Sequence, residues 1–228
     1  MNEILKVESL NAFYGRSQIT FDIDLSVNPG EVAVMVGRNG VGKTTTLKSV
    51  MGYVDKKESR VFFKNQDITE LQPHRIAKSG LTFVPDNGGV FHNLSVEDNF
   101  NVSEREGAFS RDYVFELFPK IKNILKRKGA HLSGGERKMV GISKGLLMNT
   151  DMLSVDEHSE GLAPSVVKDI PAAINKLEEK ISLFVADQNL AFILSIADRI
   201  YIMDGGRIKR AGTKEEIKKE EIEKFLAL

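Results

Sequence analysis

The chain has 228 residues, 41% of them hydrophobic, and its 32 basic side chains equal its 32 acidic ones. This length suits one globular domain, and zero net charge gives no support to bulk-charge binding, so we expect no nucleic-acid partner. The absence of cysteine excludes disulfides, thiolate metal sites and a cysteine nucleophile. The first residues do not resemble a signal peptide, and no apolar stretch approaches the ~20 residues that span a bilayer, so we expect a cytoplasmic protein.

Short runs of apolar and β-branched residues recur along the chain and predict β-strands. They cover residues 19–27, 31–37, 60–63, 81–84, 152–155, 181–186 and 199–203. The second, fourth, fifth and sixth runs are almost wholly apolar, which is typical of parallel strands covered on both faces. The first and last alternate more between apolar and polar residues, which favours an antiparallel sheet with one face in water. Asp204, Gly205 and Gly206 predict a hairpin turn after the last run.

Helical segments fall between these strands. We expect them at 42–51, 73–79, 95–102, 111–117, 134–148, 164–180 and 189–197, followed by a charged tail at 214–228 with a solvated helical face. Gly80 follows the second helix as a C′ glycine, and Ser133 is placed to cap the fifth. Sequences that resemble capping boxes start at Ser95 and Thr213. Pro171 lies inside the sixth helix and predicts a kink or a break there.

The order of these elements predicts one α/β domain over residues 1–228, with a mixed sheet and an additional antiparallel part. Residues from about 88 to 149 are mainly helical and interrupt the alternation of strands and helices. We interpret them as an inserted helical subdomain. Residues 1–87 and 150–228 would then form the core around the sheet.

A glycine-rich motif stands between the apolar run at 32–36 and the helix expected from 42. It fits the P-loop pattern G-x-x-x-x-G-K-[ST] with Gly37, Arg38, Asn39, Gly40, Val41, Gly42, Lys43 and Thr44. Glycines let the backbone wrap a phosphate at a helix N-terminus, Lys43 can reach the terminal phosphates, and the Thr44 hydroxyl can bind Mg²⁺. The alternative is a glycine-rich turn with a surface lysine, which the flanking strand and helix disfavour.

Two adjacent acids, Asp156 and Glu157, end the apolar run at 152–155. Acids are kept out of dry interiors unless something pairs with them, so this position needs a reason. In P-loop nucleotide hydrolases a second buried strand ends in an acid that holds Mg²⁺, and Asp156 fits this role. Glu157 points to the other side and is placed to orient or deprotonate a water molecule. Two solvent-facing acids at a strand end are the alternative.

The sequence Leu-Ser-Gly-Gly-Glu at 132–136 is a third signal. Ser133 caps the following helix, and the two glycines let an anion approach the N-terminus of that helix closely. A single chain with one P-loop has no use for a second phosphate site. A dimer does, if the segment Ser133–Glu136 of each subunit closes over the terminal phosphate bound by its partner. An ordinary helix cap is the alternative for the isolated motif.

These three motifs, in this order and spacing, make essentially the whole chain resemble the nucleotide-binding subunit of an ABC transporter. The resemblance implies a P-loop fold of ABC type, with a RecA-like core, an antiparallel β part and a helical subdomain. Tyr14 matches the aromatic residue that stacks on adenine in this family. Gln188 stands where most members carry a histidine that senses the γ-phosphate. Asp86 stands where most carry a glutamine that couples Mg²⁺ and water to the transporter.

Further segments resemble the ATPases of importers for branched-chain or other hydrophobic amino acids. They are residues 73–80, 90–99 and 161–164 and the pair Gln188-Asn189. Residues 159–163 match the loop that crosses the dimer seam in the family. His158, Glu160 and Asp86 depart from the usual pattern, and the aspartate is one methylene shorter than the usual side chain. It would reach Mg²⁺ only through water, which weakens coupling to the permease.

The resemblance implies an enzyme that hydrolyses ATP and powers a membrane permease through ATP-driven closure of a dimer. One subunit would bind ATP through Tyr14, Gly37, Arg38, Asn39, Gly40, Gly42, Lys43, Thr44 and Thr45, and the other through Ser133, Gly134, Gly135 and Glu136. Mg²⁺ would be held by Thr44, Asp86 and Asp156. Glu157 would activate the water, and Gln188 would hydrogen-bond the γ-phosphate. The implied partners are a second ATPase subunit, identical or related, and transmembrane permease subunits on the inner face of the cell membrane.

Other functions stay open at this point. A soluble ABC ATPase acting on DNA, ribosomes or metal-cluster assembly usually carries long inserts, tandem cassettes or basic surfaces, which this short neutral chain lacks. A regulatory or scaffold subunit with little hydrolysis is a second possibility, suggested by Asp86, His158 and Gln188. A small-molecule kinase would use the P-loop but gives no role to Tyr14 or to residues 132–136.

Overall fold

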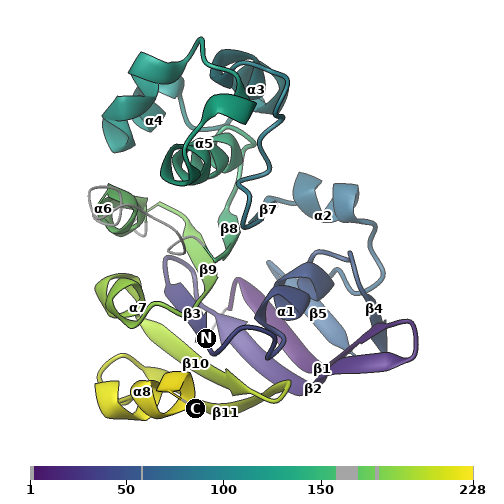
Figure 1. The fold of residues 1–228 in the computed structure, drawn as a ribbon. Coiled ribbons are helices and arrows are strands. Elements are labelled where there is room, and N and C mark those ends of the chain that lie inside the picture. Colours follow the sequence, from purple (N-terminus) through teal and green to yellow (C-terminus); the bar gives the residue numbers. More distant parts are fainter. Residues whose placement is uncertain (1–2, 58, 158–168, 178–179, 228) are drawn as a thin grey trace.

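The computed structural model describes residues 3–57, 59–157, 169–177 and 180–227. Its main sheet, seen in Figure 1, has six strands, of which five are parallel and one edge strand is antiparallel. In spatial order they are β11 (Arg207–Thr213), β10 (Arg199–Asp204), β3 (Val32–Val36), β9 (Ser182–Asp187), β8 (Met152–Asp156) and β7 (Leu81–Val84). The apolar runs are thus parallel as predicted. The run at 199–203 pairs antiparallel only with β11, across the predicted turn, and is parallel to β3 on its other side.

A second, antiparallel sheet lies on one side of the first. It consists of β2 (Ser17–Val27), β1 (Leu5–Tyr14), β5 (Arg60–Phe63) and β6 (Gln66–Asp67), with β4 (Asp55–Lys57) also paired to β1. Helix α1 (Lys43–Val50) contacts strands of both sheets. Its residues Leu47 and Val50 are buried in one apolar cluster with strand residues from the two sheets. This packing fixes α1, and with it the P-loop, between two layers.

No apolar run predicts a strand at 5–14, although β1 lies inside the second sheet between β2 and β5. The pairing of β1 with β2 shifts register between Val7 and Leu10 and again before Phe13. Ser9 in β1 and Asp22 in β2 both have φ of 49°, in the left-handed region. These bulges interrupt the period of two that identifies a strand in sequence.

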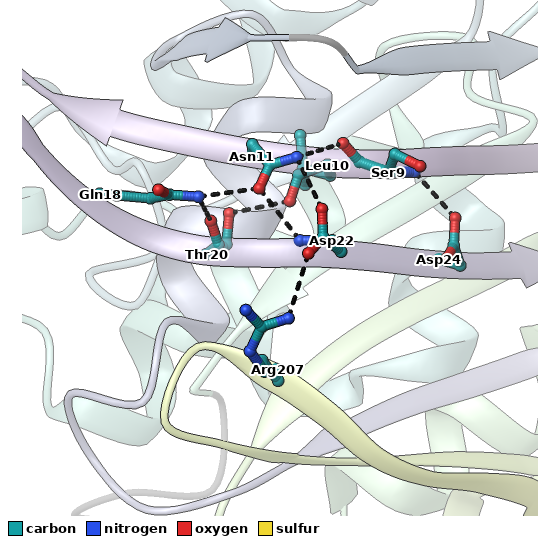
Figure 2. A network of polar contacts seen from close by, with 8 residues as sticks. All are labelled: Ser9, Leu10, Asn11, Gln18, Thr20, Asp22, Asp24 and Arg207. Atoms are coloured by element: carbon teal, nitrogen blue, oxygen red, sulfur yellow. Dashed lines mark hydrogen bonds and ion pairs between the residues drawn. The ribbon is translucent and has the colours of Figure 1, made fainter.

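A polar network fastens the bulged hairpin, as Figure 2 shows. Asn11 donates to Asp22 Oδ1 at 3.2 Å and accepts from Gln18 at 2.8 Å. Asp22 also pairs with Arg207 of β11 at 3.1 Å, which ties the hairpin to the edge of the main sheet. The same network includes Ser9, Leu10, Thr20 and Asp24. The hairpin therefore presents Tyr14, the last residue of β1, from a braced position.

Helices cover the opposite face of the main sheet and extend beyond β7 and β8. Figure 1 shows α3 (Val96–Ser103), α4 (Arg111–Leu117) and α5 (Gly134–Leu146) together at that end of the molecule. The remaining elements are α2 (Pro73–Lys78), α6 (Asp169–Leu177), α7 (Leu190–Ile196), α8 (Lys219–Ala227) and 3₁₀ turns at Pro119–Ile124 and Gly129–His131. One apolar cluster joins α5, α6 and α7 to this face of the sheet. The limits of 88 and 149 for a helical subdomain stay a prediction.

Three of the predicted helix ends are confirmed and one is wrong. Gly80 follows α2 with φ of 101°, Ser95 accepts from the Asp98 amide, and Ser133 forms a complete capping box with Glu136. The prediction at Thr213 is wrong, because β11 runs to this residue and α8 starts only at Lys219. The side chain of Glu216 does accept from the Thr213 amide at 2.9 Å, but this bond closes a turn.

The C-terminal segment is less solvated than its charge predicts. Ile217 and Ile222 are buried in the cluster with α7, so the segment packs with one apolar side. Pro171 lies near the start of α6, whose described part begins at Asp169. The kink expected there involves residues before 169, which lie outside the described part of the chain. Among the described residues, none of the helices has both the length and the apolar composition needed to cross a membrane.

Candidate functional site

Four loops meet at the carboxyl edge of the main sheet. The strands β3, β9, β8 and β7 are adjacent and parallel, so the residues that follow them emerge side by side. In register, Val36 pairs with Asp187, Ala186 with Asp156, and Val155 with Val84. Loops at a sheet edge of this kind commonly bind ligands. The P-loop, Gln188, Glu157 and Asp86 thus come together, although 150 residues lie between Gly37 and Gln188 in the sequence.

The P-loop forms a tight turn at the start of α1. Gly40 and Gly42 have φ of 82° and 110°, values that L side chains rarely adopt. Lys43 is almost fully buried, and its ammonium donates to the carbonyls of Gly37 and Arg38 at 2.8 and 2.9 Å. The lysine therefore holds the loop in its turn at the N-terminus of α1, and a helix N-terminus favours an anion.

Asp156 and Thr44 form the second part of this site. The Thr44 hydroxyl donates to Asp156 Oδ1 at 3.0 Å, and the carboxylate is 2% exposed. Burial, together with the negative charges of Glu157 and Asp86, raises the pKa of Asp156 to about 6. Asp86 is itself exposed, and its Oδ1 accepts from the Asn87 amide. The cluster of negative charge favours a cation among these oxygen atoms.

Glu157 follows Asp156 with an unusual backbone. Its φ is 45°, and its amide donates to the Ala186 carbonyl at 2.8 Å. The turn directs the carboxylate toward the P-loop, where Oε1 lies 3.5 Å from the ammonium of Lys43. The side chain is 21% exposed, so water can reach it. A carboxylate beside a phosphate-binding lysine and open to water has the placement that a general base needs.

Gln188 lines a pocket of about 430 Å³ beside the P-loop. The other lining residues are Arg38, Asn39, Val41, Asp204 and Leu226. The backbone of Gln188 is fixed by Asp187, a buried carboxylate that accepts from the amides of Gln188 and Asn189 at 2.7 and 2.9 Å. Asn189 in turn caps α7 through its side chain. Gln188 therefore has a fixed backbone position beside the loop that would hold the phosphates.

Tyr14 stands at the tip of the braced hairpin. Its side chain is 50% exposed, and it pairs across the turn with Ser17. An aromatic ring packed in the core would be buried, so this exposure shows that Tyr14 is not a core residue. A half-exposed ring on a rigid support suits stacking on a planar base.

The segment Ser133–Glu136 differs from the P-loop in its exposure. Ser133 and Gly134 are exposed at the N-terminus of α5, and Glu136 is bound by its own cap and by an ion pair with Arg127. The bonds that Glu136 makes with Ser133 and Arg127 lower its pKa, although burial opposes this change. The bonds of Glu136 thus stabilise the start of the helix, while Ser133 and Gly134 lie at the surface there.

Two buried lysines of α5 belong to no motif and were not predicted as site residues. Lys138 donates to the carbonyl of Glu157 at 2.6 Å, and Lys144 donates to the carbonyl of Gly89 at 2.5 Å. Burial lowers the pKa of Lys144 to about 8. The available signal was helical spacing, because Lys138 lies four residues before Ile142 and Lys144 lies four residues after Val140. A cation on an apolar helix face must have a specific partner.

Some predicted residues fall outside the described part of the chain. His158, Glu160 and the whole segment 159–163 are among them. Their predicted place at a dimer seam therefore stays a prediction.

Residues 20–160 match the family model described as ABC transporter, which is more than half of the chain. The chain belongs to the ABC transporter family. It is 33% identical over 225 residues to the probable branched-chain amino acid transport ATP-binding protein LivF of Archaeoglobus fulgidus, covering 96% of the chain and 95% of the relative. It is 32% identical over 225 residues to the lipopolysaccharide export system ATP-binding protein LptB of Escherichia coli K12, covering 95% and 93%.

A solved structure agrees with these relatives. The ADP conformation of an ATP-binding cassette of an ABC transporter superposes with a TM-score of 0.78 at 25% identity, over 100% of this chain and 96% of that one. The ABC ATPase fold is thus confirmed, and this ABC protein is an ATPase that uses ATP and Mg²⁺. The hydroxyl oxygen of Thr44 and the carboxylate oxygens of Asp156 fit Mg²⁺, which prefers hard oxygen ligands. Phosphate oxygens and water molecules would be the other ligands of the ion.

Proposed function

We propose that this ABC subunit hydrolyses ATP in a dimer and thereby powers the import of branched-chain or other hydrophobic amino acids. The observation that carries the proposal is the division of the site. The described chain holds Lys43 and Asp156 buried and bonded within one site, yet leaves Ser133 and Gly134 exposed at the N-terminus of α5. A second subunit, identical or related, supplies the missing half by placing Ser133, Gly134, Gly135 and Glu136 over the terminal phosphate.

The P-loop residues bind the nucleotide first. The amides of residues 37–45 surround the phosphates, and Lys43 exchanges its bonds with the Gly37 and Arg38 carbonyls for contacts to phosphate oxygens. Tyr14 stacks on the adenine. Mg²⁺, when bound by Thr44 and Asp156 with Asp86 nearby, neutralises phosphate charge. The chain residues Arg38, Asn39 and Thr45 complete the loop around the phosphates.

Two side chains act on the attacking water. Glu157 accepts a proton from it, and its carboxylate is released for this task when Lys43 turns from Glu157 to the γ-phosphate. Gln188 donates a hydrogen bond to the same phosphate from the pocket beside Asn39. The partner's contacts exist only while the γ-phosphate is present, so hydrolysis opens the dimer. This difference in binding between the two states can drive a permease.

The replacement Glu157→Gln tests the enzymatic part. We expect steady-state turnover to fall at least about 100-fold, because a general base contributes at least that factor. ATP binding should persist, and size-exclusion chromatography with ATP should show a stable dimer. Glu215→Gln, at an exposed position in the C-terminal segment, is the matched control and should behave as the parent. Parental turnover in Glu157→Gln would refute the assigned role of Glu157.

The transported substrate needs its own experiment. The permease subunits are reconstituted with this chain in proteoliposomes, and uptake of labelled leucine, isoleucine and valine is measured with and without ATP. ATP-dependent uptake supports import. The likeness to LptB makes lipopolysaccharide export the second candidate, and stimulation of the ATPase by that lipid without amino-acid uptake would favour it. No stimulation by either would favour a regulatory subunit.

A further inference from the structure

Glu157 is held by contacts from three separate elements. Its left-handed backbone, with φ of 45°, costs a residue with a β-carbon about 1–2 kcal/mol and persists only where the surroundings impose it. Strand β9 accepts its amide at Ala186, and Lys43 at the start of α1 faces its carboxylate. The third contact comes from α5, where the ammonium of Lys138 donates to the carbonyl of Glu157 at 2.6 Å.

Burial of the Lys138 ammonium would destabilise the fold if the side chain only filled space. The side chain is 7% exposed, and an ammonium taken from water destabilises the fold unless strong hydrogen bonds replace its hydration. An apolar side chain of similar length would pack there at lower cost. A short bond from a cation to a carbonyl is among the stronger hydrogen bonds in proteins. It therefore gives the backbone of Glu157 a definite position relative to α5.

Helix α5 connects this bond to the exposed Ser133–Glu136 segment. Lys138 lies five residues after Ser133, about 7 Å along the helix axis at 1.5 Å per residue. The helix has little room to move alone, because a β-carbon on Gly141 would come within 2.6 Å of Gly88. A shift of the N-terminus of α5 therefore moves Lys138 as well, because both belong to the same stiff helix.

We propose that Lys138 is a positioning residue that sets the backbone of Glu157 from α5. A nucleotide held by the partner subunit docks on the N-terminus of α5, and Lys138 passes the resulting position of α5 to the water-activating carboxylate of this chain's own site. Each ATP of the dimer thereby prepares the other site for hydrolysis. The inference rests on the proposed function, because it takes the dimer and the role of Glu157 from there.

The experiment compares Lys138→Met, which keeps the apolar stem but removes the donor, with Lys138→Arg, which keeps donors. We expect kcat to fall about 10-fold or more in the methionine variant, since an error of about 1 Å at a catalytic group can cost up to 100-fold. KM and single-chain ATP affinity should not change, the Hill coefficient for ATP should fall toward 1, and arginine should restore both kcat and cooperativity. Lys126→Met, at an exposed position, is the control and should match the parent.

Several outcomes would overturn the inference. Parental kcat and Hill coefficient in Lys138→Met would do so, as would an equal loss in the methionine and arginine variants, which indicates packing alone. If thermal melts show that the methionine variant does not fold, Lys138→Gln replaces it, because its amide keeps a shorter donor. An intermediate kcat is then expected, and parental values count against the proposal. An inactive Glu157→Gln beside a normal Lys138→Met would contradict only this inference, whereas an active Glu157→Gln would contradict the proposed function itself.

Discussion

The P-loop and the Ser133–Glu136 segment both offer helix N-termini to phosphate, but they are built differently. Lys43 and Asp156 are buried and bonded to their neighbours within one chain. Ser133 and Gly134 are exposed, and the bonds of Glu136 serve the helix cap and Arg127. The first region is preformed, while the second is a surface. This difference is what the proposed mechanism requires, in which one chain binds the nucleotide and a second chain completes the site for hydrolysis.

Replacing Lys43 should break the preformed region most severely. Lys43→Ala removes the charge that would face the terminal phosphates, and we expect ATP affinity to fall about 100-fold, since a charged hydrogen bond contributes about 1.5–3 kcal/mol. Isothermal titration of the isolated chain with ATP and Mg²⁺ measures this loss. Lys126→Ala, at an exposed position, should bind as the parent. Full affinity in Lys43→Ala would contradict the assigned P-loop role.

A charge at the exposed region should separate binding from turnover. Gly134→Glu places an acid in the first turn of α5, which the helix dipole stabilises by about 0.3–1 kcal/mol, so the fold should persist. The acid repels a phosphate held by the partner. We expect turnover to fall at least about 30-fold and ATP-dependent dimerisation to vanish, because like charges across an interface cost several kcal/mol.

The same variant should leave the first region untouched. ATP affinity of the single chain should stay at the parental value, and the neutral variant Gly134→Ala should keep part of the turnover. Isothermal titration measures the ATP affinity of the single chain, and sedimentation measures ATP-dependent dimerisation. A Gly134→Glu protein that still dimerises with ATP would show that the N-terminus of α5 does not meet the nucleotide.

Asp156→Asn should show by how much the buried charge of Asp156 destabilises the nucleotide-free fold. The raised pKa of Asp156, about 6 against an ordinary 3.8, means that the nucleotide-free fold binds a proton more tightly than the unfolded chain does. Stability from this protonation is complete below pH 3.8 and is lost as the pH rises through 6. At pH 7 we expect the nucleotide-free asparagine variant to be about 2–3 kcal/mol more stable, at about 1.4 kcal/mol per pKa unit.

Denaturant melts of both proteins from pH 4 to pH 8 test this prediction. The gap in unfolding free energy should open from about pH 4, as the pH rises through 6, and become constant above about pH 7. With ATP and Mg²⁺ the order should reverse, because the asparagine lacks the charge that Mg²⁺ requires. A gap that does not change with pH would contradict the assigned burial cost.

Tyr14 should give the smallest of these effects. Removing the ring in Tyr14→Ala should raise the Kd for ATP about 10-fold, because stacking of a base on an aromatic ring contributes about 1–3 kcal/mol. Tyr14→Phe keeps the ring and should bind as the parent. Since the side chain is half exposed, thermal stability should change little in either variant. Equal affinity in all three proteins would exclude stacking.

Much of the fold could be predicted because its signals are local. The buried strands appear as apolar runs, and the caps at Ser95 and Ser133 involve residues three positions apart. β1 escaped prediction because its bulges break the alternation, and α8 was placed too early because the single turn that starts at Thr213 does not continue as a helix. Both errors arise where distant partners override local pattern.

The sequence by itself determined the chemistry of the site, since the glycines, lysine, hydroxyl and acids of the motifs occur at spacings that phosphate binding demands. Tertiary structure decided which of these groups meet. The strand order β3-β9-β8-β7 brings the four loops to one edge, and no spacing along the chain encodes that order. Packing of α5 against Glu157 likewise made Lys138 a neighbour of the site. Such contacts depend on how buried surfaces fit together, a property of the whole fold.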